Sequence, residues 1–229
     1  QQELLALPVS ATTKTSTKKP ATGVCAVSDS EVFFTNSHVV SRWIVGQRVS
    51  IYAGREPTSH DEADGHRLKE ARFPDSSLRG IFVSLPSRII WLICDNMVKK
   101  IDSEMVSTHA GSWRKGHQDG RGVKATFWEP SNLVEHNNEI FVTDRWNHVI
   151  RRIDQQGNVT TIGTGAPKPN VDGPFDSCTF VCPRGICVGP GNSLLISSTG
   201  SGTIQKIDLD AKTVSTIAGS VAIFDGRAA

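Results

Sequence analysis

The chain has 229 residues, 38% of them hydrophobic, which is enough to bury a substantial core. Its 25 Lys and Arg residues nearly balance 23 Asp and Glu residues, and the resulting net charge of +2 excludes a bulk attraction to nucleic acid or anionic membranes. No apolar run reaches the roughly 18 to 20 residues that span a bilayer, so we expect no membrane insertion. The sequence indicates no particular cellular compartment.

Residues 1–21 are predicted to form a flexible, low-complexity segment. Within them, residues 10–20 read SATTKTSTKKP, a polar stretch without the apolar periodicity of a strand or helix. The folded part of the chain is therefore expected to begin at residue 22.

From residue 22 onward the sequence repeats with a period of about 55 residues. Four segments end alike, in VSIYAG from Val49, VSTHAG from Val106, VTTIGTG from Val159 and VSTIAG from Val214, so the valines are 57, 53 and 55 residues apart. An Asp-Gly pair follows each ending, with spacings of 55, 53 and 53 residues. These pairs are Asp64-Gly65, Asp119-Gly120, Asp172-Gly173 and Asp225-Gly226. Two markers that keep one register indicate a repeat architecture.

The third unit, between Gly111 and Gly163, shows the repeat most clearly. It contains four short segments that are β-branched or alternate apolar with polar side chains, separated by Asn and Gly residues that suit tight antiparallel turns. The predicted strands are Ser131–Val134, Glu139–Thr143, His148–Ile153 and Asn158–Ile162. Each unit is therefore predicted to be a four-stranded antiparallel meander.

One such sheet cannot bury both of its faces, so the units must stack face to face, as the blades of a β-propeller do. We expect an all-β fold with about four blades, at approximately residues 22–54, 55–111, 112–165 and 166–219. Each Asp-Gly pair is assigned to the connection from an outer strand to the next inner strand, and the Phe after it is expected to fill the gap between blades. Residues 220–229, SVAIFDGRAA, are interpreted as the start of a further, incomplete blade.

The string DRWNHVIRRID at Asp144–Asp154, followed by NVTTIGTG and by the Asp-Gly, Phe and Pro positions, resembles the NHL repeat. The resemblance extends over about Gly23–Gly226 and is strongest in the third unit. The second unit has CDNMVKKID in place of the string, and the fourth has STGSGTIQKID. The resemblance implies that these blades are part of a larger, commonly six-bladed, ring and that partners bind on a loop face.

No catalytic signature is present in the sequence: HExxH, GxSxG, a Walker loop and GxGxxG before a helix are all missing. We therefore predict no enzyme activity and no cofactor. The predicted inner strands supply only Glu135 as a metal ligand, which is too few for a metal site. Three of the five cysteines, Cys178, Cys182 and Cys187, cluster without the CxxC spacing of zinc sites, which leaves buried thiols or a Cys178–Cys182 disulfide.

The predicted loop face carries the strongest functional signal. The connections from outer to inner strand and from second to third strand meet on one side of a wedge-shaped blade, and in the third unit they are rich in Trp, Arg and Lys. Arg and Trp dominate the energetics of protein interfaces, and they also stack on bases and bind phosphates. The candidate binding residues are Trp113, Arg114, Lys115, Arg121, Lys124, Trp128, Arg145 and Trp146.

A protein partner is the favoured interpretation of this face, with the chain acting as an interaction scaffold. Single-stranded RNA is the first alternative, because some relatives of the repeat bind RNA there. Its weakness is that the basic excess is confined to one blade, whereas a nucleic-acid groove runs across several. A metal-dependent lyase or hydrolase, with its site in further blades, is the second alternative.

Overall fold

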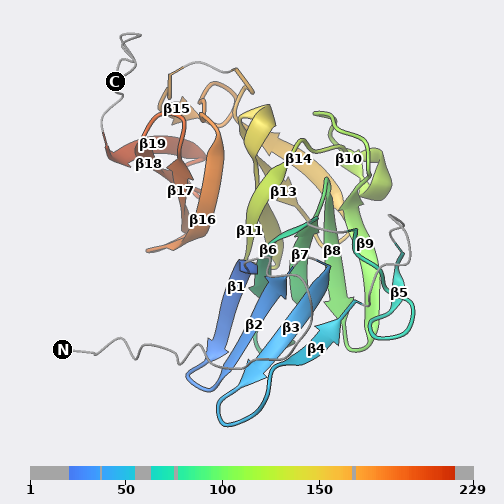
Figure 1. Cartoon of the computed structure of the whole chain (residues 1–229). Coiled ribbons are helices and arrows are strands. Elements are labelled where there is room, and N and C mark those ends of the chain that lie inside the picture. Colours follow the sequence, from blue (N-terminus) through green and yellow to red (C-terminus); the bar gives the residue numbers. More distant parts are fainter. Residues whose placement is uncertain (1–20, 37, 55–62, 75–76, 167–168, 220–229) are drawn as a thin grey trace, which may run out of the picture.

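The computed structural model of the chain describes residues 21–36, 38–54, 63–74, 77–166 and 169–219. Its strands form four antiparallel sheets, arranged as propeller blades with one strand of each nearest a common centre (Figure 1). The predicted all-β propeller fold is thereby confirmed. The expectations for residues 1–20 and 220–229 lie outside the described residues.

The first two blades contain strands β1 to β9. The first blade has the order β1-β2-β3-β4 and the second the order β5-β9-β8-β7-β6. The strands of the first are β1 (Ala21–Ser28), β2 (Glu31–Asn36), β3 (Val39–Ile44) and β4 (Ser50–Ala53). Those of the second are β5 (Gly65–His66), β6 (Leu78–Val83), β7 (Ile90–Cys94), β8 (Met97–Asp102) and β9 (Met105–Gly111).

The third and fourth blades have the same order as the second, β10-β14-β13-β12-β11 and β15-β19-β18-β17-β16. The strands of the third are β10 (Gly120–Arg121), β11 (Pro130–His136), β12 (Glu139–Asp144), β13 (Val149–Ile153) and β14 (Asn158–Ile162). It also holds two 3-10 turns, η1 (Gly122–Lys124) and η2 (Arg145–Asn147). The strands of the fourth are β15 (Gly173–Pro174), β16 (Pro183–Gly189), β17 (Ser193–Ser198), β18 (Thr203–Asp208) and β19 (Thr213–Ala218).

Three blades contain a short fifth strand that the repeat pattern did not predict. In these three blades the glycine of the Asp-Gly pair (Gly65, Gly120 or Gly173) opens β5, β10 or β15, which pairs with the outer strand of its blade. These glycines have φ between +130° and +152°, a conformation that other residues rarely adopt. The preceding Asp accepts a hydrogen bond from a threonine of that outer strand, as Asp64 Oδ2 does from the Thr108 N–H at 2.7 Å. The Asp-Gly pair therefore fastens the connection to the edge of the blade.

The hydrophobic core is divided into three clusters, one between each pair of adjacent blades. One fully buried phenylalanine belongs to each cluster, and these are Phe73, Phe127 and Phe180. Each ring packs against a glycine at or just after the end of an outer strand, so closely that a Cβ at Gly111 would lie 2.9 Å from the ring of Phe127. The expectation that the Phe fills the gap between blades is confirmed.

All five cysteines are free thiols, so the Cys178–Cys182 disulfide is not formed. Cys178 is buried against the fourth blade's core, and burial raises the pKa of its thiol to about 11. In the part of the chain that the structure describes, no helix is long and apolar enough to cross a membrane.

His109 joins the second blade to the third. Its Nε2 donates a hydrogen bond to the carbonyl oxygen of Asp154 at 3.1 Å, and its ring packs edge-on against Trp91 with 4.9 Å between the ring centroids. Burial lowers the pKa of His109 below its usual value of 6.5, because desolvation disfavours the charged imidazolium.

Because the folded-state pKa of His109 is below the unfolded-state value, protonation favours the unfolded chain. The stabilisation from neutral His109 is therefore present above about pH 6.5 and is lost as the pH falls through the lowered folded-state pKa. We expect the urea midpoint to fall between about pH 7.5 and 5.5, and the His109→Gln variant to show a smaller fall. An equal fall in both proteins would contradict this role of His109.

Candidate functional site at the loop face

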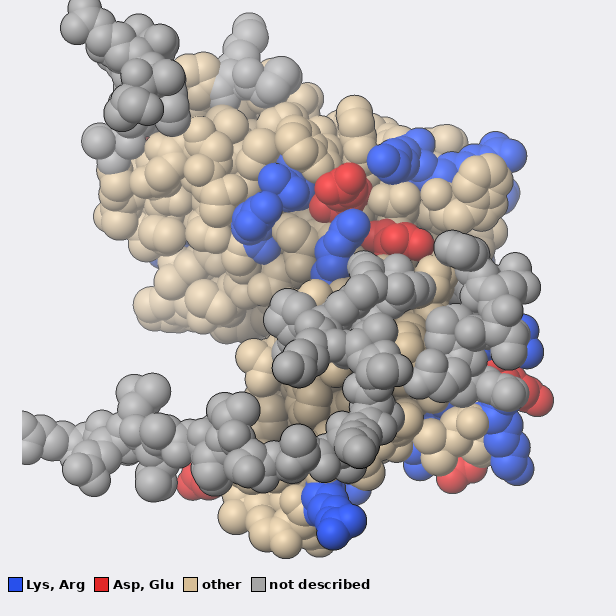
Figure 2. Space-filling view, viewed as in Figure 1, with Lys and Arg blue, Asp and Glu red and all other residues tan. Residues whose placement is uncertain are grey.

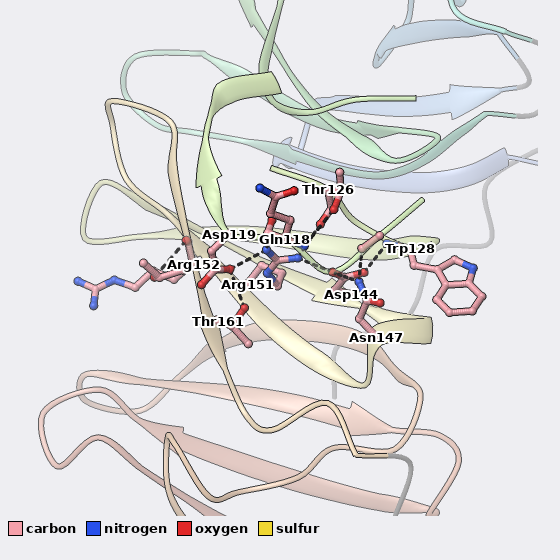
Figure 3. Close-up of polar contacts among 11 residues, drawn as sticks. Gln118, Asp119, Thr126, Trp128, Asp144, Asn147, Arg151, Arg152 and Thr161 are labelled. Atoms are coloured by element: carbon pink, nitrogen blue, oxygen red, sulfur yellow. Dashed lines mark hydrogen bonds and ion pairs between the residues drawn. The ribbon is translucent and has the colours of Figure 1, made fainter. Parts of the chain in front are cut away.

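A buried arginine holds the connections of the third blade in place. Arg151 lies on β13, and its side chain is fully buried. Its guanidinium donates to Asp144 Oδ2 at 2.9 Å and Asp119 Oδ1 at 2.7 Å (Figure 3). It also donates to the carbonyl oxygens of Gln118 at 2.9 Å and Thr126 at 2.8 Å. A buried charge is tolerated only when it is paired and hydrogen-bonded in this way, so the connection between Gln118 and Thr126 depends on Arg151.

Asp144 ends β12 and fixes the turn that follows. Burial raises the pKa of its carboxyl group, and hydrogen bonds from Asn147, the Trp128 N–H and Arg151 act in the opposite direction. The Asn147 amide donates to Asp144 Oδ2 at 2.8 Å and to the Gly116 carbonyl at 2.6 Å. These bonds fix η2 against the preceding connection.

His148 couples the third blade to the fourth. It follows η2 in the left-handed conformation, with φ of 58°. Its Nδ1 accepts a hydrogen bond from the Cys182 N–H at 3.1 Å, just before β16. Burial lowers the pKa of His148, which favours the neutral ring that this acceptor role requires.

One exposed tryptophan, Trp146, lies on this fixed turn, and a second, Trp128, lies beside it in the connection before β11. Trp146 is 40% exposed, and the guanidinium of Arg145 lies 4.7 Å from the centre of its ring. The indole N–H of Trp146 donates to Glu129 Oε2 at 2.9 Å. Its backbone N–H donates to the carbonyl oxygen of Trp128 at 3.2 Å, which brings Trp128, 42% exposed, alongside. We call Trp128, Arg145 and Trp146 the tryptophan cluster.

A groove of about 960 Å³ lies beside the tryptophan cluster, between β9 and the connection that precedes β11. Trp113 lines it and is 74% exposed, with the Arg114 guanidinium 5.3 Å from its ring centre. Lys115 and Lys124 also line the groove, and Lys115 Nζ lies 3.9 Å from Glu129 Oε1. Basic, aromatic and aliphatic side chains are thus combined on one surface.

Arg121 is the one predicted binding residue that the structure does not bring to this surface. Its Nε donates to the carbonyl oxygen of Gln156, in the turn between β13 and β14. That turn lies at the opposite end of the sheet from η2, because the connection runs down the outer edge of the blade before it pairs with β14. The other seven predicted residues form the tryptophan cluster or line the groove.

Charges of both signs occupy the visible face. Figure 2 shows Lys and Arg side chains in the upper half of the view with Asp and Glu side chains between them.

No candidate metal site is found in the described part of the chain. Among the residues that the structure describes, no three His, Cys, Asp or Glu side chains are arranged to hold a metal ion. Glu135 on β11, singled out from the sequence, is half-buried, and burial raises the pKa of its carboxyl group.

The stacked antiparallel blades, the Asp-Gly pairs at their edges and the loop face define a repeat β-propeller. The chain is similar to NHL repeat-containing protein 2 of cattle, with 34% identity over 105 residues, and of humans, with 33% identity over 107 residues. The matched part is 44% of this chain in both cases, but only 14% and 15% of the relatives' length. These matches support the resemblance to the NHL repeat over the matched part of the chain. No family model matches the chain.

Solved structures share the fold. An auxiliary nutrient binding protein from Bacteroides thetaiotaomicron is 17% identical, with a TM-score of 0.63 over 86% of this chain and 48% of its own. One from Bacteroides ovatus is 14% identical, with a TM-score of 0.62 over the same shares. Identities this low show a likeness of fold alone.

Arg151 and its neighbour Arg152 provide a matched pair for testing the buried network. Replacing Arg151 by Met leaves the buried Asp144 carboxylate without its cation, and we expect a loss of about 3–5 kcal/mol in the free energy of unfolding. Arg152 is exposed and pairs with Glu139 at the surface, so Arg152→Met is expected to cost less than about 1 kcal/mol. Urea unfolding of both variants measures the difference in the free energy of unfolding. Similar losses in the two variants would show that the buried network stabilises the fold no more than a surface ion pair does.

Proposed function

We propose that this chain is a non-enzymatic protein-interaction scaffold, which binds its partner through the tryptophan cluster and the adjoining groove. The observation that supports this most strongly is the exposure of Trp113, Trp128 and Trp146 within one blade. Tryptophan is the side chain most enriched among residues that dominate binding energy, and exposed aromatic groups of this size mark interaction surfaces.

The contacts of Trp146 already hold this side chain in place before a partner binds, which also supports the proposal. Trp146 is held by the Arg145 guanidinium on one side and by its hydrogen bond to Glu129 on the other. The backbone beneath it is fixed by Asn147 and Asp144. Little side-chain freedom is left to lose on association, so more of the contact energy appears as affinity.

Charge indicates the chemistry of the partner. Arg114, Lys115 and Lys124 line the groove, while Glu129 is the acidic side chain that contacts the tryptophan cluster. We therefore propose a protein segment that combines apolar side chains, for the indole rings, with acidic side chains, for the basic rim. Single-stranded RNA would also stack on tryptophan, and the experiment below separates the two.

The direct test is a pull-down from native lysate, with nuclease-treated samples in parallel. The wild-type chain is expected to retain a protein partner after nuclease treatment, and the Arg145→Ala/Trp146→Ala double variant is expected to lose it. With the purified partner, we expect the double variant to weaken binding by at least about 2 kcal/mol, as loss of an interface anchor does.

Arg121→Ala is the matched control, because it also removes a basic side chain but lies away from the loop face. It is expected to bind like the wild-type chain. Capture of RNA that is lost in the double variant would replace the protein proposal with the RNA one. Equal binding by the double variant and the control would exclude the tryptophan cluster as the site.

A further inference from the structure

A second cavity lies where the inner strands of all four blades begin. Its volume is about 630 Å³, and residues from β1, β6, β11 and β16 line it together with Glu129 and Arg145. Arg79 on β6 and Arg184 on β16 occupy the same position in the repeat, each directly before a glycine. Three arginines therefore line one cavity at the centre of the propeller.

The lining carries an excess of positive charge. Arg79, Arg145 and Arg184 contribute three guanidinium groups, which stay protonated at any physiological pH, against the single carboxylate of Glu129. That carboxylate accepts a hydrogen bond from Trp146 and lies 3.9 Å from both Lys115 Nζ and Arg145 Nη1, so two positive charges of the lining remain unbalanced. Like charges gathered in a recess repel one another, and an anion bound between them relieves this repulsion.

Hydrogen-bond donors remain available in the cavity. Arg79 donates through one Nη1 bond to the Pro130 carbonyl at 3.1 Å. The Nε of Arg145 is buried and has no hydrogen-bond partner among the residues that the structure describes. Arg184 is exposed, and the described residues supply no hydrogen-bond partner for its guanidinium. The planar array of guanidinium donors matches the oxygens of phosphate and carboxylate groups.

Two of these arginines have a fixed backbone. The carbonyl of Arg79 accepts a hydrogen bond from Thr35 Oγ1 at 3.1 Å, across the junction of the first and second blades. The carbonyl of Arg184 accepts hydrogen bonds from Ser131 Oγ at 3.2 Å and Thr143 Oγ1 at 3.0 Å, across the junction of the third and fourth blades. The same device therefore positions Arg79 and Arg184, which preorganises the cavity for a ligand.

We propose that this cavity binds a small molecule that carries phosphate or carboxylate groups, between Arg79, Arg145 and Arg184. Its volume lies in the range of small-molecule sites and exceeds the size of one inorganic ion, so the ligand has a body beyond its anionic group. The site shares Arg145 with the tryptophan cluster, whereas Arg79 and Arg184 lie outside that cluster and the groove. Variants at Arg79 and Arg184 therefore test this site separately from the proposed protein partner.

The test is calorimetric titration of the chain with inorganic phosphate and with citrate, at constant chloride concentration. We expect saturable one-to-one binding of at least one of the two anions. The Arg79→Gln and Arg184→Gln variants are each expected to weaken it by roughly tenfold or more, because each removes a charge-assisted pair. Tighter binding of phosphate would assign the phosphate class, and tighter binding of citrate the carboxylate class.

Arg48→Gln is the matched control, since it removes the same charge from an exposed arginine in the turn between β3 and β4. It is expected to leave the affinity unchanged. Absence of saturable binding of both anions to the wild-type chain up to about 10 mM would overturn the proposal, as would equal weakening by Arg48→Gln. If Arg79→Gln fails to fold, Arg184→Gln alone tests the proposal. The Arg184 side chain is exposed, so its replacement is not expected to prevent folding.

Discussion

The third blade depends on one buried guanidinium that is shared between two carboxylates. Arg151 reaches Asp144, which begins the η2 turn, and Asp119, which belongs to the Asp-Gly pair at the outer edge of the blade. One side chain therefore ties together the two connections that make up the loop face. Without it, Asp144 would be a buried carboxylate lacking its cation, and the turn that carries Trp146 would lose its anchor.

The other blades use different side chains at the same position. In the second blade Lys99 is fully buried and donates to Asp64 Oδ1 at 2.7 Å, and in the fourth blade Gln205 donates to the Thr179 carbonyl at 3.2 Å. Among the described blades, the charged pairing with two carboxylates occurs in the third. The same blade carries the three exposed tryptophans, so this network lies in the blade of the proposed binding surface.

Much of the fold could be predicted from the sequence, because the Asp-Gly and Phe positions recur in one register. In the described blades the Phe fills the space between neighbouring blades, and the Asp-Gly pair fixes the connection to the blade edge. β14 begins and ends at the predicted residues, Asn158–Ile162. Arg121 is predicted on the loop face but lies at the opposite end of the blade. The sequence does not show that the connection runs down the blade edge and pairs as β10. The burial of Arg151 could have been predicted from the sequence. Alternation along β13 places Arg151 on the same face as Val149 and Ile153, which are both buried. The central cavity could not be predicted from the sequence, because residues more than 100 positions apart form its lining.

We infer that the buried network, and not the local sequence of the turn, holds the tryptophans in place. Hydrogen exchange at the Trp128 backbone amide reports on this directly, since this N–H donates to Asp144 Oδ1 at 2.8 Å. In the Arg151→Met variant, under conditions where the chain remains folded, the amides of Trp128 and Trp146 should lose protection while those of β2 in the first blade keep theirs. Unchanged protection at Trp128 and Trp146 would show that Arg151 does not hold the tryptophans in place.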